Sequence, residues 1–279
     1  MKPQKILVPI DFSSCSKNAL QNAILFAKRT DAQLLLLHAF FVPTPHAAVG
    51  TTAFVEALAQ EETESINEEF LKLKSEVETL EDVKYEILSK RGSVKDVIIH
   101  AIKDHQIDLI IMGTKGASGI DEVIFGSNAY SVINATNKPV LTIPQEAKLD
   151  KIEKIVFASD YRHIVDRKVF EPLVWLANTF KAELKILHIS GGIDYLPQEE
   201  AFEAKKLEQF FKYVKHSYQF YKHDHIIDGL NEYLENDAPD LLALLPREHH
   251  MIDKLFKTSV TKKIALHTKV PLFTIHENN

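Results

Sequence analysis

The sequence predicts an α/β protein of two tandem, doubly wound domains, each with a five-stranded parallel sheet. Three observations lead to this prediction. Short blocks of the first half recur in the same order in the second half. Strand-like and helix-like segments alternate along each half. The strand-like segments are apolar throughout, as expected for strands that helices cover on both faces.

The internal repeat consists of four pairs of matching blocks. These pairs are residues 5–13 and 154–162, 32–38 and 182–188, 108–112 and 240–244, and 138–143 and 270–275. The first pair places Asp11 and Asp160 149 positions apart, and the second places His38 and His188 150 positions apart. We interpret the chain as a tandem duplication joined by the polar stretch near residues 144–153, with domains at 1–146 and 150–279.

Local patterns predict the first five elements of the N-terminal half. Residues 6–10 are continuously apolar and predict a buried strand, and residues 34–37 predict a second one. Between them, residues 16–30 carry apolar side chains at helical spacing. A long charged segment at 56–80 also has helical spacing, and residues 83–88 alternate like a strand.

The remaining elements of this half complete the sheet. A Ser-x-x-Asp pattern resembles a capping box and opens a helix at 93–103. Residues 109–112 and 140–143 predict the fourth and fifth strands, with a helix at 127–137 between them. Strands separated by helices pair in parallel through right-handed crossovers. Ligands of such sheets bind beyond the carboxyl ends of the strands, where the strand order reverses.

Composition and charge exclude several classes of protein. Hydrophobic residues make up 45% of the 279 residues and charged residues 26%, which excludes a mainly disordered or fibrous chain. No apolar run is long enough for a transmembrane helix, and the first apolar run is too short for a signal peptide. The net charge of -6 argues against a nucleic-acid binder. With Cys15 as the one cysteine, we expect a cytoplasmic protein.

A glycine cluster marks the candidate ligand site. Four of the nine glycines directly follow the fourth strand: Gly113, Gly116, Gly119 and Gly126. Glycine allows close approach of the backbone and positive φ, and successive backbone N–H groups then form an anion-binding concavity. Gly126 and Ser127 open a helix whose N-terminus suits a phosphate. Taken singly, each glycine is equally compatible with a tight turn and an N-cap serine.

The spacing Gly-x2-Gly-x9-Gly-Ser resembles the ATP-binding signature of the universal stress protein family. The Val-Pro-x-Asp that ends the first strand, the Leu-Leu-His of the second and the Asn-Lys-Pro-Val-Leu at the fifth agree with it. The resemblance covers the whole chain, once per half. It implies the adenine nucleotide alpha hydrolase-like fold, with strand order 3-2-1-4-5. Because the last strands of family members pair antiparallel across a dimer axis, it also implies an intramolecular pseudo-dimer and leaves open a further homodimer.

The resemblance also implies a set of nucleotide-binding residues between strands 1 and 4. These are Pro9, Asp11, Ala39, Met112, Gly113, Gly116, Gly126, Ser127 and Asn128. By this resemblance, Asp11 and the backbone at Pro9 contact the adenine end of the nucleotide, and the backbone of Ala39 contacts the base. The glycines line the ribose and phosphates. Asp11 has a second interpretation, as a cap of the following helix. Ala129 stands where many members have Ser or Thr, which removes one phosphate contact.

The second half departs from this pattern. Residues 245–259 contain no glycine, and Thr258 stands in the place of Gly126. Asp160 and Ser259 remain, but side chains occupy positions where backbone has to meet phosphate. We interpret this half as a degenerate copy that has lost standard nucleotide binding.

Two functions follow as hypotheses. The first is an ATP-binding regulatory protein of the stress response, with one competent site in the N-terminal domain. In this hypothesis ATP binds with or without magnesium, and the protein partner is unknown. The second is a scaffold or interaction protein of the same fold that binds no nucleotide. The sequence offers no catalytic set and no metal-ligand spacing, so we expect at most slow ATP hydrolysis, and no nucleic-acid or membrane partner.

Overall fold

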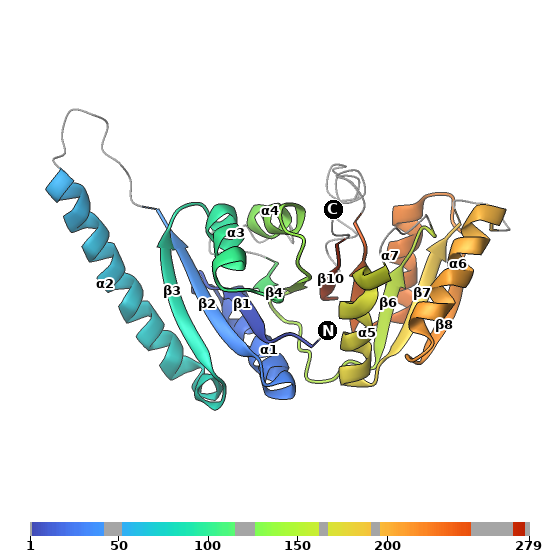
Figure 1. The fold of residues 1–279 in the computed structure, drawn as a ribbon, viewed down its shortest axis with the longest axis horizontal. Coiled ribbons are helices and arrows are strands. Elements are labelled where there is room, and N and C mark those ends of the chain that lie inside the picture. The colour runs from blue at the N-terminus through green and yellow to red at the C-terminus, as the bar shows by residue number, and fades with distance from the viewer. Residues whose placement is uncertain are drawn as a thin grey trace.

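The strands of both halves form one continuous sheet (Figure 1). The computed structural model describes residues 2–41, 52–114, 126–161, 167–190, 196–246 and 270–276. The ten strands lie in the order β3-β2-β1-β4-β5-β10-β9-β6-β7-β8. Each half therefore has the order 3-2-1-4-5, which confirms the predicted topology.

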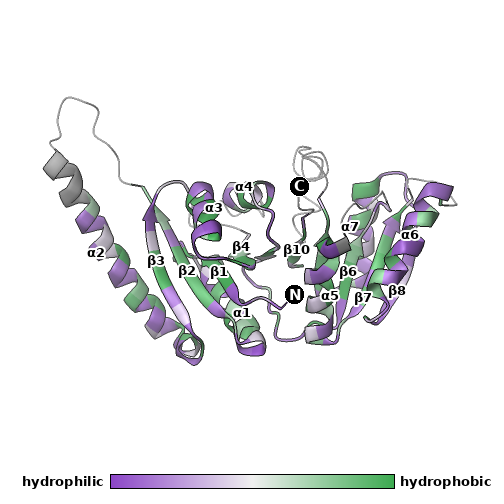
Figure 2. Cartoon of the chain, in the orientation of Figure 1, coloured by the Kyte–Doolittle hydropathy of each residue, from purple (hydrophilic) through white to green (hydrophobic). Residues whose placement is uncertain are grey.

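The strands agree closely with the apolar runs of the sequence. Their bounds are β1 Lys5–Pro9, β2 Gln33–Phe40, β3 Tyr85–Arg91, β4 Leu109–Gly113, β5 Val140–Ile143, β6 Lys154–Ala158, β7 Glu183–Ile189, β8 His216–Tyr221, β9 Leu241–Leu244 and β10 Leu272–Thr274. Within each half all the strand pairs are parallel. Figure 2 shows the strands mostly green, as expected for a sheet with helices on both faces.

The helices cover the sheet in two layers. Their bounds are α1 Ser14–Thr30, α2 Thr52–Glu76, α3 Val94–Asp104, α4 Ser127–Ala135, α5 Glu171–Phe180, α6 Gln198–Phe211 and α7 Ile226–Asp237, with short 3-10 helices at η1 Glu78–Asp82 and η2 Arg167–Phe170. Apolar side chains of α1, α2, α5 and α6 share one core cluster, which runs across both halves. The opposite face has separate clusters, under α3 and α4 in the first half and under α7 in the second.

A partly buried aspartate fixes the start of each half in the same way. Asp108 Oδ2 accepts hydrogen bonds from the backbone N–H of Gln4 and Lys5 at 2.8 and 3.1 Å. In the second half, Asp240 Oδ2 accepts from the N–H of Glu153 and Lys154 at 2.7 and 2.9 Å. Each aspartate thereby ties the segment before the fourth strand to the start of the first. This equivalence supports the duplication at the level of single hydrogen bonds.

The two halves meet where β5 and β10 pair antiparallel. Leu272, Phe273 and Thr274 lie opposite Thr142, Leu141 and Val140. The Thr142 hydroxyl donates to the Leu272 carbonyl and the Thr274 hydroxyl to the Val140 carbonyl, each at 3.3 Å. Neither threonine is exposed to solvent. The strand pairing expected from the family dimer thus occurs within one chain.

The shared core and this strand pair predict that the first half does not persist as a monomer. A fragment of residues 1–146 exposes the edge of β5 and the side of Phe26 that faces Trp175 and Phe180. The unpaired N–H and C=O groups of an edge strand favour pairing with a strand of another molecule. We expect the fragment to be a homodimer or to aggregate when its mass is measured by light scattering after size-exclusion chromatography.

A longer fragment provides the control for this experiment. Residues 1–152 keep the linker that Asn18 and Asn22 hold by hydrogen bonds, so any loss of packing along the linker is restored. It should still associate, because the edge of β5 remains open. A monodisperse monomer of either fragment would contradict the prediction.

Candidate functional site

The residues of the candidate site converge at the carboxyl ends of β1, β2 and β4. β1 lies between β2 and β4 in the sheet, and all three strands are parallel. Pro9 ends β1, Asp11 follows it, Ala39 lies near the end of β2, and Gly113 ends β4. This is the point where the strand order reverses, which is where doubly wound sheets bind ligands.

Asp11 stabilises the start of α1 through hydrogen bonds to Ser13. Its Oδ1 accepts hydrogen bonds from the Ser13 hydroxyl at 2.6 Å and from the Ser13 N–H at 3.2 Å. Ser13 is the N-cap of α1, and its hydroxyl oxygen accepts from the Ser16 N–H. The cap is therefore Ser13, with Asp11 in a supporting position. A contact with a ligand and this structural contact are compatible, because a carboxylate accepts several hydrogen bonds.

A histidine on the second strand supports the same loop in both halves. His38 Nδ1 lies 2.7 Å from the Ile10 carbonyl oxygen, and His188 Nδ1 lies 3.1 Å from that of Ser159. Each ring also contacts an aromatic residue with positive φ, Phe12 in the first half and Tyr161 in the second. The Leu-Leu-His match of the sequence thus reflects a loop support that both copies retain.

Gly113 is a glycine because of its contact with α1. A Cβ atom at this position would lie 2.8 Å from Cys15 Sγ and 3.2 Å from the Cys15 backbone. Gly113 does not have a positive φ, and neither does Gly126, at -62°. The expectation that these glycines supply positive φ is therefore wrong. Close packing explains Gly113, and Gly126 has an ordinary extended conformation.

Among the described residues, no side chain caps the start of helix α4, as is also the case for α5, α6 and α7. The N-cap of α4 is Gly126, which has no side chain to accept a hydrogen bond, whereas α1 and α3 are capped by Ser13 and Ser93. The first intrahelical bond is donated by Tyr130, so the N–H groups of residues 127–129 precede it. Ser127 and Asn128 are exposed. This helix end thus presents backbone donors and a positive dipole end.

Thr114 is a site residue that the sequence did not reveal. Its N–H donates to the Ile143 carbonyl at 3.1 Å, and its carbonyl accepts from the Gly126 N–H at 2.6 Å. The second bond joins the end of β4 to the start of α4. A single threonine after a strand gives no recognisable signal, because this contact depends on the return of the chain twelve residues later.

The remaining predicted site residues are Met112 and Gly116, and Ala129 is the position expected to lack a phosphate contact. The Met112 side chain is buried in the core under α3 and α4, so only its backbone faces the site. Ala129 is also buried there, at 2% exposure, and offers no hydroxyl. Gly116 lies outside the described residues, as does most of the segment 245–259 in which the second half lacks glycine.

Aromatic rings surround the histidine of the second strand in both halves. The ring centroid of His38 lies 4.9 Å from that of Phe12 and 6.4 Å from that of Phe70. His188 stacks on Tyr161, with ring centroids 4.9 Å apart, and on Phe220, at 5.6 Å. The halves differ opposite the histidine, where Ser89 of the first half corresponds to Phe220 of the second. Burial raises the pKa of Tyr161 to about 12.

Two further classes of function find no support in the parts of the chain that the structure describes. No group of three or more His, Cys, Asp or Glu side chains there could hold a metal ion. None of the helices placed by the structure is long and apolar enough to cross a membrane.

The contact between Gly113 and Cys15 gives a stability prediction. Gly113→Ala should lower the free energy of unfolding by about 1–3 kcal/mol, because the new methyl group overpacks the α1–β4 contact. Urea unfolding measures the change. In a Cys15→Ala background the same substitution should cost clearly less, because Sγ is the nearest atom. Equal costs in both backgrounds would show that this contact does not require the glycine.

Comparison with known proteins agrees with the fold and the repeat. The universal stress protein family model matches residues 2–144. Universal stress protein MJ0577 of Methanocaldococcus jannaschii is 30% identical over 155 residues, covering 51% of this chain and 96% of that protein. Universal stress protein YxiE of Bacillus subtilis is 30% identical over 144 residues, covering 50% of this chain and 97% of that protein.

One solved structure resembles both halves together. It is a universal stress protein from Archaeoglobus fulgidus with a TM-score of 0.68 and 14% sequence identity, and the match covers 99% of this chain and 97% of that one. At this identity the likeness concerns the fold alone. The single-length relatives match about half of the chain, and the structural likeness spans both halves. This chain therefore belongs to the universal stress protein family, as a tandem member.

Proposed function

We propose that the N-terminal half binds an adenine nucleotide, ATP with or without magnesium, and that the protein acts through this binding as a regulator in the stress response. The observation that carries the proposal is the uncapped start of α4 beside the carboxyl ends of β1 and β4. Backbone N–H groups at a helix N-terminus are suited to phosphate oxygens. The membership in the universal stress protein family supports the same proposal.

The proposed binding mode assigns each part of the nucleotide to one edge of the site. The phosphates lie at Gly126, Ser127 and Asn128, at the N-terminus of α4. The adenine and ribose lie toward Pro9, Asp11 and Ala39, with the backbone of Met112 and Gly113 alongside, and with Gly116 as a further proposed contact. We assign no catalytic role to any residue, so slow hydrolysis is the most that binding would permit.

The domain division and the pseudo-dimer belong to the same proposal. We propose that residues 1–146 form the nucleotide-binding domain and residues 150–279 a partner domain that has lost this activity. The residue opposite the histidine of the second strand differs between the halves, Ser89 beside His38 and Phe220 beside His188, which supports an asymmetric pair. A cytoplasmic location fits a regulator of this kind.

Substitutions at Gly126 test the phosphate site. Gly126→Val should weaken ATP binding more than tenfold, because its methyl groups occupy the approach to the α4 N-terminus, while the extended backbone at this position accepts a side chain. Gly126→Asp should abolish binding and preserve or raise the melting temperature, because its carboxylate caps the helix and repels phosphate. Isothermal titration calorimetry and thermal unfolding measure the two effects.

The control for these variants is Asn178→Asp, which adds the same charge at an exposed site on α5. It should leave ATP affinity unchanged. If Gly126→Asp bound ATP as tightly as the unmodified protein, the phosphates could not lie at α4. If the unmodified protein bound no adenine nucleotide with or without magnesium, the scaffold hypothesis would replace the proposal.

The two aspartates test the asymmetry of the halves. We expect about one ATP per chain, with Asp11→Ala reducing affinity strongly and Asp160→Ala having little effect. Because Asp11 also supports Ser13, Asp11→Asn serves as a matched variant that keeps an acceptor for the Ser13 donors. A calorimetric stoichiometry near two, or equal sensitivity to both alanine substitutions, would show that both halves bind ATP.

A further inference from the structure

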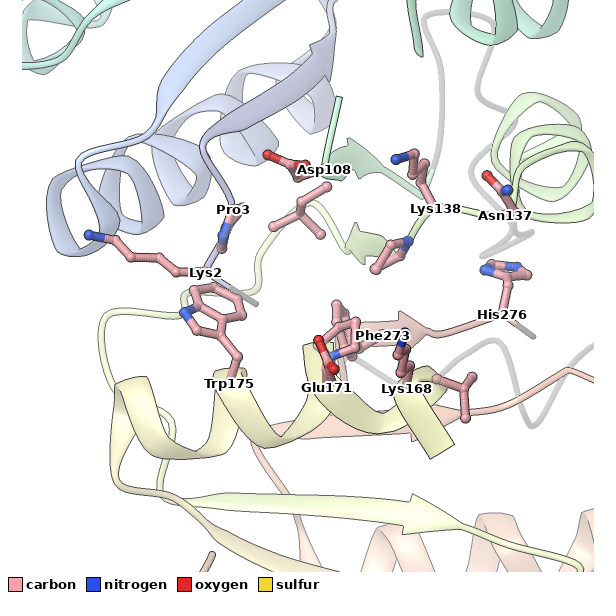
Figure 3. A pocket seen from close by; sticks show the side chains of 14 residues that line it. Lys2, Pro3, Asp108, Asn137, Lys138, Lys168, Glu171, Trp175, Phe273 and His276 are labelled. Carbon is pink, nitrogen blue, oxygen red and sulfur yellow. The ribbon is translucent and has the colours of Figure 1, made fainter. Parts of the chain in front are cut away.

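A cavity of about 260 Å³ lies between the two halves, beside the β5–β10 pair (Figure 3). Because these strands are antiparallel, the start of β5 meets the end of β10. One wall comes from the first half, including Asn137 and Lys138 just before β5. The opposite wall comes from η2 and α5 of the second half and from the end of β10. This cavity is distinct from the proposed nucleotide site, which lies at the other ends of β1 and β4.

The internal repeat relates this cavity to a position in the first half. The corresponding groove beside α1 is occupied by the linker between the halves. Asn18 Nδ2 donates to the carbonyls of Pro144 and Ala147 at 2.8 and 2.9 Å, and Asn22 Oδ1 accepts from the Leu149 N–H at 2.7 Å. Leu149 is 1% exposed, so the linker fills that groove completely.

The second half lacks the side chains that hold the linker. At the repeat distance of 150 residues, Lys168 and Pro172 take the places of Asn18 and Asn22. Both line the cavity, together with Trp175 on the next turn of α5. At these two positions no asparagine side chain is present to hold a peptide backbone by hydrogen bonds. The groove has instead acquired a cation and an aromatic ring.

The lining of the cavity combines an apolar floor with a cationic rim. Phe273 and Leu109 are 1% and 3% exposed, and Trp175 adds a half-buried indole. Three lysines contribute positive charge: Lys2, Lys138 and Lys168. The two carboxylates of the lining are Asp108, whose Oδ2 already accepts two backbone N–H groups, and Glu171. The lining is thus net positive, in a chain whose net charge is -6.

We propose that this cavity binds a small amphipathic carboxylate, with its apolar body against Trp175 and Phe273 and its carboxylate toward Lys138 and Lys168. A volume of 260 Å³ suits a ligand on the order of ten non-hydrogen atoms, given about 30 Å³ for each water molecule in the liquid. Apolar walls with a few charged groups are typical of small-molecule sites. Because both halves line the cavity, a ligand bound there stabilises their association.

The single tryptophan of the chain makes this binding directly observable. Phenylacetate is the probe, and excitation at 295 nm reports on Trp175. We expect a saturable change in fluorescence, with a Kd on the order of 1 mM or tighter for a ligand of this size, and a higher melting temperature. Phenylethylammonium has the same ring with the opposite charge and acetate lacks the ring, so both should bind at least about tenfold more weakly.

Variants locate the site. Lys138→Gln and Lys168→Gln should each weaken phenylacetate binding about fivefold or more, and Lys212→Gln, beyond the end of α6, should have no effect. ATP in excess should not displace the probe. The proposal is overturned by a non-saturable response, by equal binding of phenylethylammonium, by unchanged affinity in both cavity lysine variants, or by competition with ATP. The first three of these results leave the proposal of ATP binding at α4 untouched, whereas competition with ATP would place ATP at the cavity.

Discussion

The antiparallel pairing of β5 with β10 is the interaction on which the rest of the architecture depends. Without it, each half would be a parallel sheet whose open edge is a short, buried strand. The pair closes both edges at once and places the hydroxyls of Thr142 and Thr274 on carbonyls of the facing strand. It also merges the layer of α1 and α5 into one core, in which Phe26 meets Trp175 and Phe180.

The two halves share the hydrogen bonds that support their strands and loops but differ at other positions. The aspartates at 108 and 240 and the histidines at 38 and 188 make equivalent bonds in both halves, because the strand starts and loop supports of this fold need them. Other positions have diverged. Phe220 takes the place of Ser89 beside the histidine, and Lys168 takes the place of Asn18 near the contact between the halves.

The topology of the fold could be predicted from the sequence because its inner strands are buried on both faces and therefore mostly apolar, whereas the outer strands β3 and β8 are only partly buried. Element ends were less predictable. The helical spacing at 56–80 continues through Leu80, but α2 ends at Glu76 and Leu80 reaches the core from the separate turn η1. The third strand begins at Tyr85 and not at residue 83, because Val83 still closes that turn through its N–H to Leu80.

The physical role of one candidate position could not be predicted from the sequence. Gly113 was predicted for its contact with a ligand, but the structure shows close packing against Cys15, a neighbour in space 98 positions away in sequence. The Thr114–Gly126 bond and the cavity beside Trp175 likewise join segments that no local pattern relates. Contacts of this kind follow from the strand pairing of the whole sheet, so sequence periodicity does not reveal them.

The most direct test of the central claim is the response of individual backbone amides to ATP. In a nitrogen-15 correlation spectrum, the amide resonances of Gly126, Ser127 and Asn128 should shift saturably with added ATP, because their region holds the phosphates. The resonances of Asp160 and Ser190, at the corresponding end of the second half, should remain in place. Shifts confined to the second half, or no shift at the start of α4 at saturating ATP, would contradict the account.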